Sequence, residues 1–369
     1  MILARHSWRC FGALILFAAC RATLPSAYQT ESLGTLVGCE GIACPESDEI
    51  VEVTYLGVSG LIVSHRGHVL MTAPFFSNPR LGLVRPRATR FFRSSPRIAP
   101  DTSAIEKLLP RAADRASAIL VGHGHYDHLL DVPYIARRRA TSALVYGSAT
   151  VRHMLMGDQV LRANNGGRLI LIHAADAGTI DRQGVWIYTT DSAFRFMPLV
   201  AGHAPMLHLF GGSYNFASGT VSTDMASLPR TAPDWKLGEP YAFLIDVLEP
   251  GNSDPVFRIF FQDAPSPPPL GFPPLALIQE RGVDLAVICA ATSSNVPHTP
   301  DSLLTVLRPR QVLVTHWESF FRSQTLPPEV SRGLHLDSFL ANLSRTLGSA
   351  VPWAMPLPRT VIRFPISRP

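Results

Sequence analysis

The sequence predicts an α/β fold in which a single domain buries large sheets against helices, and three observations lead to this expectation. Hydrophobic residues make up 46% of the 369 residues and charged residues only 17%, which is typical of a globular chain with a sizeable core. From about residue 50, short runs rich in β-branched and aromatic residues alternate with segments of helical period. No internal repeat or linker interrupts this pattern, so one domain is expected over residues 49–369.

The strand-like runs extend along this whole domain, each bounded by Gly, Pro, Asn or Asp. Two of them, residues 50–56 and 67–73, are expected to pair as a meander at its beginning. Eight more are expected at 116–122, 142–147, 167–173, 184–190, 241–248, 257–263, 284–290 and 311–316. Helical segments are expected at 101–110, 148–156, 300–307 and 336–347. The proline-rich stretch 264–274 should form a rigid loop between a strand and a helix.

The first 48 residues resemble an export segment rather than part of the folded domain. Arg5 and Arg9 flank the start of an apolar run at 11–19 that is too short to span a bilayer, and small residues follow it, as in a signal peptide over 1–20. The stretch LFAAC is similar to a bacterial lipobox, in which Cys20 is lipidated, with 21–48 as a tether. We therefore expect the protein in the periplasm or on a membrane surface as an envelope lipoprotein, and cleavage without lipidation stays open.

Cysteine usage and charge bear on the compartment and on partners. Cys39 and Cys44 are close enough to form a small disulfide loop in an oxidising compartment, whereas Cys289 is expected to be a buried apolar thiol. The net charge of +5 rests almost wholly on arginine, because only Lys107 and Lys236 of the 33 basic residues are lysines. The basic residues form no stripe interleaved with aromatic residues, so no nucleic-acid partner is expected.

The densest group of metal-binding residue types is HGHYDH, at residues 123–128. His123 and His125 follow an apolar strand and are two residues apart, so their imidazoles can point the same way and converge on one ion. Asp127 and His128 lie where the chain turns and could hold a second ion nearby. Imidazole together with carboxylate favours zinc, iron or manganese over calcium or magnesium. The alternative is a solvated polar loop.

The HxHxDH pattern after a strand resembles the signature of the metallo-β-lactamase-fold hydrolases, and the resemblance covers about residues 50–320. It implies a four-layered αβ/βα sandwich and two divalent metal ions, with zinc favoured and iron or manganese as alternatives. It also implies three later ligands, which are His203, Asp263 and His316. His208 competes with His203, but the His-Ala-Pro context matches the family better, and Asp263 has the alternative of capping a turn.

Two further stretches, TYLGVSGLIV and THWESFF, are most similar to the phospholipase-D-like and lactonase-like branch of that family. The sequence departs from the family at Ala73, where an aspartate before proline is common, and at Gln262, where glycine usually precedes the aspartate. These departures affect the orientation of neighbouring groups and the local turn, and neither removes a ligand.

The resemblance implies an exported metal-dependent hydrolase acting on a small or lipid-like substrate. One ion would be held by His123, His125 and His203, and the other by Asp127, His128 and His316, with Asp263 bridging. A hydroxide between the two ions would attack an ester-type bond, either a phosphodiester or a lactone or ester, and Asp127 is the catalytic candidate. The sequence contains neither a G-x-S-x-G elbow nor a P-loop.

Candidate substrate contacts and two rival functions remain open. Arg90 and Arg93 belong to an arginine-rich segment at 80–97 that could attract an anionic group, although a solvated loop is the simpler interpretation. His298, beside the helix expected at 300–307, is a further candidate. The rival functions are an iron-dependent redox enzyme on the same fold and a non-catalytic envelope lipoprotein.

Overall fold

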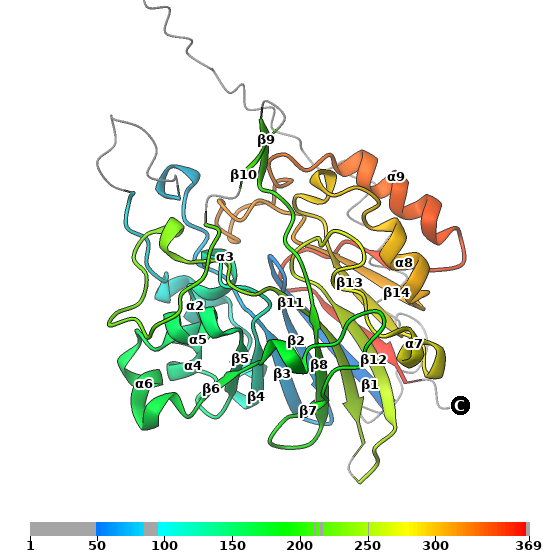
Figure 1. Ribbon diagram of the computed structural model, residues 1–369, viewed down its shortest axis with the longest axis horizontal. Coiled ribbons are helices and arrows are strands. Elements are labelled where there is room, and N and C mark those ends of the chain that lie inside the picture. The colour runs from blue at the N-terminus through cyan, green and yellow to red at the C-terminus, as the bar shows by residue number, and fades with distance from the viewer. Residues whose placement is uncertain (1–48, 85–94, 210–211, 215–216, 250, 367–369) are drawn as a thin grey trace, which may run out of the picture.

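The computed structural model describes residues 49–84, 95–209, 212–214, 217–249 and 251–366. Two seven-stranded sheets face each other, and helices cover the outer side of each (Figure 1). The predicted four-layered αβ/βα sandwich is therefore confirmed. The expected signal peptide, the tether, Cys20, Cys39, Cys44, Arg90 and Arg93 lie outside the described residues, so export, lipidation, the disulfide and the arginine contacts stay predictions.

The first sheet has the strand order β16–β1–β2–β3–β4–β5–β6. Its strands are β1 (Ile50–Gly57), β2 (Gly60–His65), β3 (His68–Thr72), β4 (Ala116–Leu120), β5 (Leu144–Gly147), β6 (Leu169–Leu171) and β16 (Val361–Pro365). β3 to β6 are parallel, and the other neighbours are antiparallel. The expected pairing of residues 50–56 with 67–73 is wrong, because β2 lies between β1 and β3.

The second sheet has the order β15–β14–β13–β12–β11–β8–β7. Its strands are β7 (Ile187–Tyr188), β8 (Phe194–Val200), β11 (Tyr241–Leu248), β12 (Pro255–Phe261), β13 (Leu285–Cys289), β14 (Gln311–Thr315) and β15 (Trp353–Ala354). β12 to β15 are parallel, while β7, β8, β11 and β12 pair in antiparallel fashion. A separate two-stranded ribbon is formed by β9 (Leu207–Leu209) and β10 (Gly212–Tyr214).

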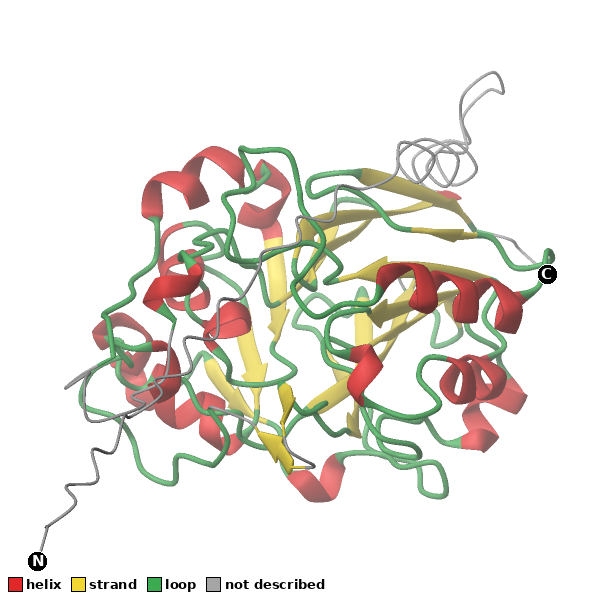
Figure 2. Cartoon of the chain, turned by 90° about the horizontal axis from the view of Figure 1, so that it is seen from above, coloured by secondary structure: helices red, strands yellow, loops and turns green. Residues whose placement is uncertain are grey.

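The helices divide between the two outer faces. Against the first sheet lie α2 (Thr102–Leu108), α3 (Tyr126–Leu129), α4 (Val132–Arg138), α5 (Ala149–Leu155) and α6 (Gln159–Gly166). Against the second lie α7 (Leu275–Glu280), α8 (Asp301–Leu307) and α9 (Leu336–Leu347). Figure 2 shows the two groups of helices from above, on opposite sides of the strands. Among the described residues, no helix is long and apolar enough to cross a bilayer.

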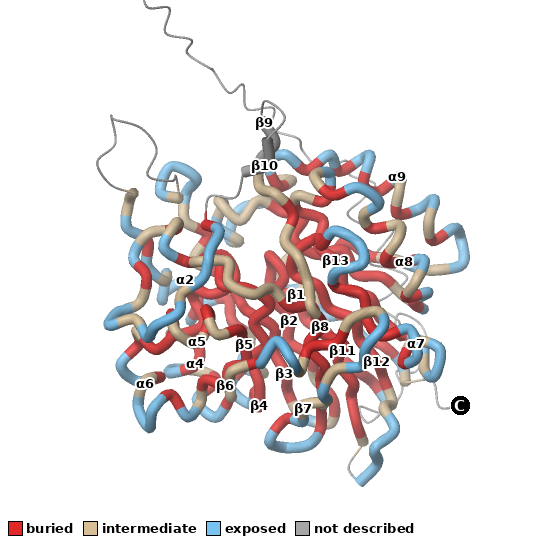
Figure 3. The backbone as a smooth tube through the Cα atoms, in the orientation of Figure 1, coloured by how far each residue is buried: buried red, intermediate tan, exposed pale blue. Residues whose placement is uncertain are grey.

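Strand alternation divides the buried side chains into three cores, as four stacked layers require. In β1, for example, Val51, Val53 and Tyr55 point towards the second sheet and belong to the same core as its phenylalanines, such as Phe243. The opposite faces of the two sheets pack against α2–α6 and against α7–α9, respectively. Figure 3 shows the strands as the buried interior. The sheets are thus held rigidly from both sides, and loops at their edges can carry function.

Candidate metal centre

Residues from four segments of the chain meet at one edge of the sandwich. They are His123, His125, Asp127, His128, His203, Asp263 and His316. β4, β8, β12 and β14 each end within three residues of one of them, and Asp127 and His128 lie on the short helix α3. Because β8, β12 and β14 run in the same direction, their carboxyl ends lie along the same edge of the second sheet.

Three sets of donor atoms lie close together among the described residues, and two of them contain the residues that the resemblance assigns to one ion each. In the first group, nitrogens of His123, His125 and His203 lie within 4.8 Å of one another. In the second group, one donor atom from each of Asp127, His128 and His316 also lies within 4.8 Å of the other two. Oδ2 of Asp127 lies 3.6 Å from Nε2 of His128 and 3.5 Å from Nε2 of His316. Each group offers three protein donors, which is the number that catalytic zinc sites use.

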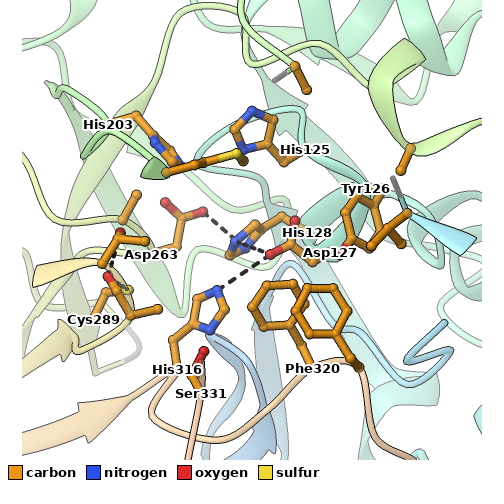
Figure 4. A pocket seen from close by; sticks show the side chains of 18 of the residues that line it. His125, Tyr126, Asp127, His128, His203, Asp263, Cys289, His316, Phe320 and Ser331 are labelled. Carbon is orange, nitrogen blue, oxygen red and sulfur yellow. Dashed lines mark hydrogen bonds and ion pairs between the residues drawn. The ribbon is translucent and has the colours of Figure 1, made fainter. Parts of the chain in front are cut away.

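Asp263 connects the two groups, as Figure 4 shows. Its Oδ1 lies 3.2 Å from Nδ1 of His123, in the first group. Its Oδ2 lies 3.6 Å from Nδ1 of His128, in the second group. A carboxylate in this place can contribute one oxygen to each side, which is the bridging position expected from the resemblance.

The donor set fits two metal ions, because several of its atoms are buried and have no hydrogen-bond partner. These atoms are Nε2 of His123, Nε2 of His125, Nδ1 of His128, Oδ2 of Asp263 and Nδ1 of His316. Buried polar atoms are nearly always paired, so five unpaired ones in a single cluster need an explanation. Divalent cations at the two groups would supply partners for the atoms that face them, whereas Nδ1 of His316 lies across the ring from Nε2, the nitrogen that faces Asp127.

Hydrogen bonding also fixes the tautomer of His203. Its Nδ1 lies 2.6 Å from the carbonyl oxygen of Ala204, and a carbonyl can only accept, so Nδ1 carries the proton. Nε2 of His203 is then the nitrogen with a free lone pair. Metal-binding histidines commonly donate their other ring N–H in this way.

Burial favours the neutral form of four histidines of the cluster. It lowers the pKa of His123, His125 and His203 below the ordinary value and that of His128 to about 3. Burial alone would raise the pKa of Asp127, but the neighbouring His128 and His316 outweigh it, and this pKa is well below its usual range. Neutral imidazoles and an ionised carboxylate are the protonation states that bind metal.

These pKa shifts predict that the metal-free protein binds zinc at pH 6 with little proton release from the four histidines whose pKa is lowered. Four ordinary histidines, with a pKa near 6.5, would together lose about three protons at that pH. We expect fewer than about one from this set, because the nitrogens are already deprotonated. Calorimetric titration in buffers of different ionisation enthalpy measures the number, and a release of three or more would contradict the expected state of the cluster.

A buried hydrogen-bond network, which the sequence analysis missed, positions His316. The hydroxyl of Tyr55 accepts from the backbone N–H of His316 at 3.0 Å and donates to Glu318 Oε2 at 2.6 Å. Oε1 of Glu318 accepts from the backbone N–H of Val58 at 2.6 Å. His316 has a φ of 55°, a left-handed conformation that is rare for a residue with a side chain, and the network holds its backbone there.

The segment after β3 is also tied to the metal centre by a carboxylate. Asp131 follows α3 and is fully buried, and it accepts from the backbone N–H groups of Phe76 at 2.6 Å and Ser77 at 2.9 Å. Burial raises the pKa of Asp131 to about 6. Ala73, where the family usually has an aspartate, is buried at the start of this segment. Asp131 thus anchors the segment although Ala73 offers no polar group.

A cavity of about 420 Å³ opens beside the cluster. Six of the seven cluster residues line it, all except His123, and Cys289 lines it as the buried thiol expected from the sequence. The structure does not bring His298 into this cavity, since its side chain is 79% exposed and lies 3.9 Å from Asp301. The side chain of His208, the competitor of His203, lies outside the described residues.

No family model matches the sequence, and no curated protein matches it. Solved structures similar to the chain include Igni18, a metallo hydrolase from Ignicoccus hospitalis, at 15% identity and a TM-score of 0.47 over 86% of this chain and 100% of that one. YhfI from Bacillus subtilis, a metallo-β-lactamase-fold protein, is 12% identical with a TM-score of 0.44 over 84% and 98%. CmlA from Streptomyces venezuelae, a diiron β-hydroxylase, is 14% identical with a TM-score of 0.48 over 87% and 55%.

Proposed function

We propose that this protein is a metal-dependent hydrolase that cleaves an ester-type bond at the edge of the αβ/βα sandwich. The observation that supports the proposal is the arrangement of two three-residue donor groups around Asp263, with unpartnered donor atoms and an adjoining cavity. The adjoining cavity gives water and substrate access to the ions, which a catalytic metal site needs and a closed structural site does not.

The roles of the chain's own residues follow from their geometry. His123, His125 and His203 would hold one ion, Asp127, His128 and His316 the other, and Asp263 would contact both. When bound, such ions supply Lewis acidity towards a substrate oxygen and lower the pKa of water. Asp127 stays ionised between His128 and His316, so it orients both rings and balances positive charge.

The proposal is tested by metal reconstitution and hydrolysis of simple substrates. Protein stripped of metal and then loaded with zinc, manganese or iron is expected to hold about two ions per chain and to hydrolyse a carboxylic ester, a lactone or a phosphodiester. Metal content and kcat/KM are measured on the same samples. Asp127→Ala should lose one ion and lower kcat/KM at least about 100-fold, because the second donor group is incomplete.

Asp337→Ala is the matched control, since Asp337 is an exposed aspartate on α9, remote in sequence from the cluster. It should retain the metal content and the activity of the parent protein. If the protein loaded with about two ions hydrolyses none of the three substrates with any of the metals, the proposal is wrong. Oxygen consumption by the iron-loaded protein alone would then favour the redox alternative.

A further inference from the structure

The cavity beside the metal centre is mainly apolar on its described surface. Outside the cluster, its larger side chains are Leu81, Val84, Met206, Pro233, Phe320 and Phe321. Thr292, Ser331 and Arg332 are the polar exceptions apart from the hydroxyl of Tyr126 and the thiol of Cys289. Among the described lining residues, Arg332 is the one charged group that does not belong to the cluster, and it is exposed.

The apolar surface reaches the donor groups themselves. The ring of Phe320 lies 5.1 Å from that of His316 and 4.2 Å from that of Phe321, measured between centroids. Tyr126, between two cluster residues in the sequence, lies 6.3 Å from Phe320. Figure 4 shows Phe320 and Tyr126 beside Asp127 and His316. A substrate bound at the metal centre would therefore have its neighbouring group against aromatic carbon rather than water.

Charge separates the two substrate classes that the sequence leaves open. A phosphodiester keeps a negative charge, which the two ions of the proposed function would attract, and binding sites for phosphate groups commonly add arginine, lysine or backbone N–H donors. Among the described lining residues outside the cluster, Arg332 is the one such donor, and it is exposed to solvent. A carboxylic ester or lactone is uncharged, so only its carbonyl needs polar contact and the rest of it can be apolar.

We infer that the substrate is an uncharged carboxylic ester or lactone with an apolar acyl or aromatic group that fills this cavity, an inference that rests on the proposed function. In the reaction, water oxygen forms a bond to the carbonyl carbon and the bond from this carbon to the alkoxy oxygen breaks. The products are a carboxylate, an alcohol and one proton. The cavity volume of about 420 Å³ lies in the range of pockets that bind small organic ligands.

The experiment measures kcat/KM of the zinc-loaded protein for p-nitrophenyl esters from acetate to decanoate and for bis(p-nitrophenyl) phosphate. We expect kcat/KM to rise up to about fourfold for each added methylene group until the cavity is filled, since each buried methylene contributes that factor to binding. The phosphodiester should be a poorer substrate than hexanoate. A value for the phosphodiester above those of all the esters, or no rise with chain length, would overturn the inference.

Two neighbouring leucines provide a matched pair of variants. Leu81 and Leu83 are both 42% exposed and lie on the same short 3₁₀ helix, but only Leu81 lines the cavity. Leu81→Ser should reduce the ratio of kcat/KM for decanoate to that for acetate several-fold, and Leu83→Ser should leave this ratio unchanged. Equal reductions in both variants would contradict the assignment of the cavity to the acyl group.

A binding measurement that needs no turnover separates the inference from the proposed function. Straight-chain 2-alkanones are uncharged ester analogues without a scissile bond, and their dissociation constants for the metal-free protein can be measured by calorimetry. We expect affinity to increase with chain length and Leu81→Ser to weaken it. If the alkanones bind in this way but no ester is hydrolysed, the apolar cavity is supported and the hydrolase is not. If the phosphodiester is hydrolysed and the alkanones do not bind, the hydrolase is supported and the apolar substrate is not.

Discussion

Gly122→Ala is expected to disrupt the metal centre although it changes none of the proposed ligands. A Cβ atom on Gly122 would lie 2.5 Å from both Cγ and Oδ1 of Asp263, a distance that real Cβ contacts do not reach. Neither partner can move easily. The carbonyl oxygen of Gly122 accepts from the backbone N–H of Tyr241 at 2.8 Å, and Asp263 follows the fully buried end of β12.

The expected result is displacement of the Asp263 carboxylate, the group that touches both donor groups. We expect metal affinity to fall by about 10- to 100-fold and kcat/KM by at least about 100-fold. Both are measured on zinc-loaded protein, with the unfolding midpoint recorded alongside. Gly282→Ala is the control, because nothing lies within 4 Å of a Cβ atom at Gly282. Retention of two tightly bound ions by Gly122→Ala would show that Asp263 does not bridge them.

The strands that the sequence predicted are those with the clearest alternation or the longest apolar runs. β4, β11, β13 and β14 fall within the expected ranges, β12 overlaps its range but begins at Pro255, and the ends of these strands place most of the cluster. The sequence pattern did not predict β8, because FRFMPLV contains Pro198 and proline is uncommon in the interior of a strand. β7 pairs with β8 only at Arg195 and Phe196. Pro198 lies beyond this pairing, so its lack of a backbone N–H removes no hydrogen bond to β7.

The cluster was accessible from the sequence, whereas the groups that support it were not. HxHxDH is a local pattern, and each later ligand follows a recognisable strand. The contact between Tyr55 and Glu318 joins residues 263 positions apart, and only the packing of the two sheets, which brings the end of β1 to the residues after β14, reveals it. The sequence did place Glu318 two residues after His316, in HWE, and a charged residue there next to apolar neighbours is a signal that could have been used. The cavity is likewise assembled from distant segments, so its apolar character has no local signature.

A buried ion network on the outer face of the second sheet leads to the largest stability effect that we expect. Asp246 on β11 is opposite Arg258 on β12 and Arg195 on β8, and it has no exposed surface. Arg258 Nε donates to Asp246 Oδ1 at 2.6 Å, and Arg195 Nε donates to Oδ2 at 2.9 Å. The ring of Trp186 lies 4.5 Å from the guanidinium carbon of Arg195 and covers it.

Asp246→Ala is expected to lower the free energy of unfolding by about 3–5 kcal/mol, because it leaves the buried charge of Arg258 without a partner. Denaturant unfolding measures this value. Glu52→Ala is the matched control, since Glu52 pairs with Arg363 across neighbouring strands at 2.8 Å but both side chains are more than 40% exposed. Its cost should stay below about 1 kcal/mol. Similar costs for the two variants would contradict the role of burial.

The double replacement Asp246→Leu with Arg258→Met distinguishes the loss of charge pairing from the loss of packing. Replacing a buried ion pair by apolar residues of similar size is often neutral or stabilising, so this variant should regain much of the stability lost in Asp246→Ala. Arg258 also donates to the carbonyl oxygens of Leu277 at 3.1 Å and Arg281 at 3.0 Å, at the end of α7. We therefore expect amide hydrogen exchange in α7 to remain faster in the double variant than in the parent protein, because the helix end has lost its cationic partner even where global stability has returned.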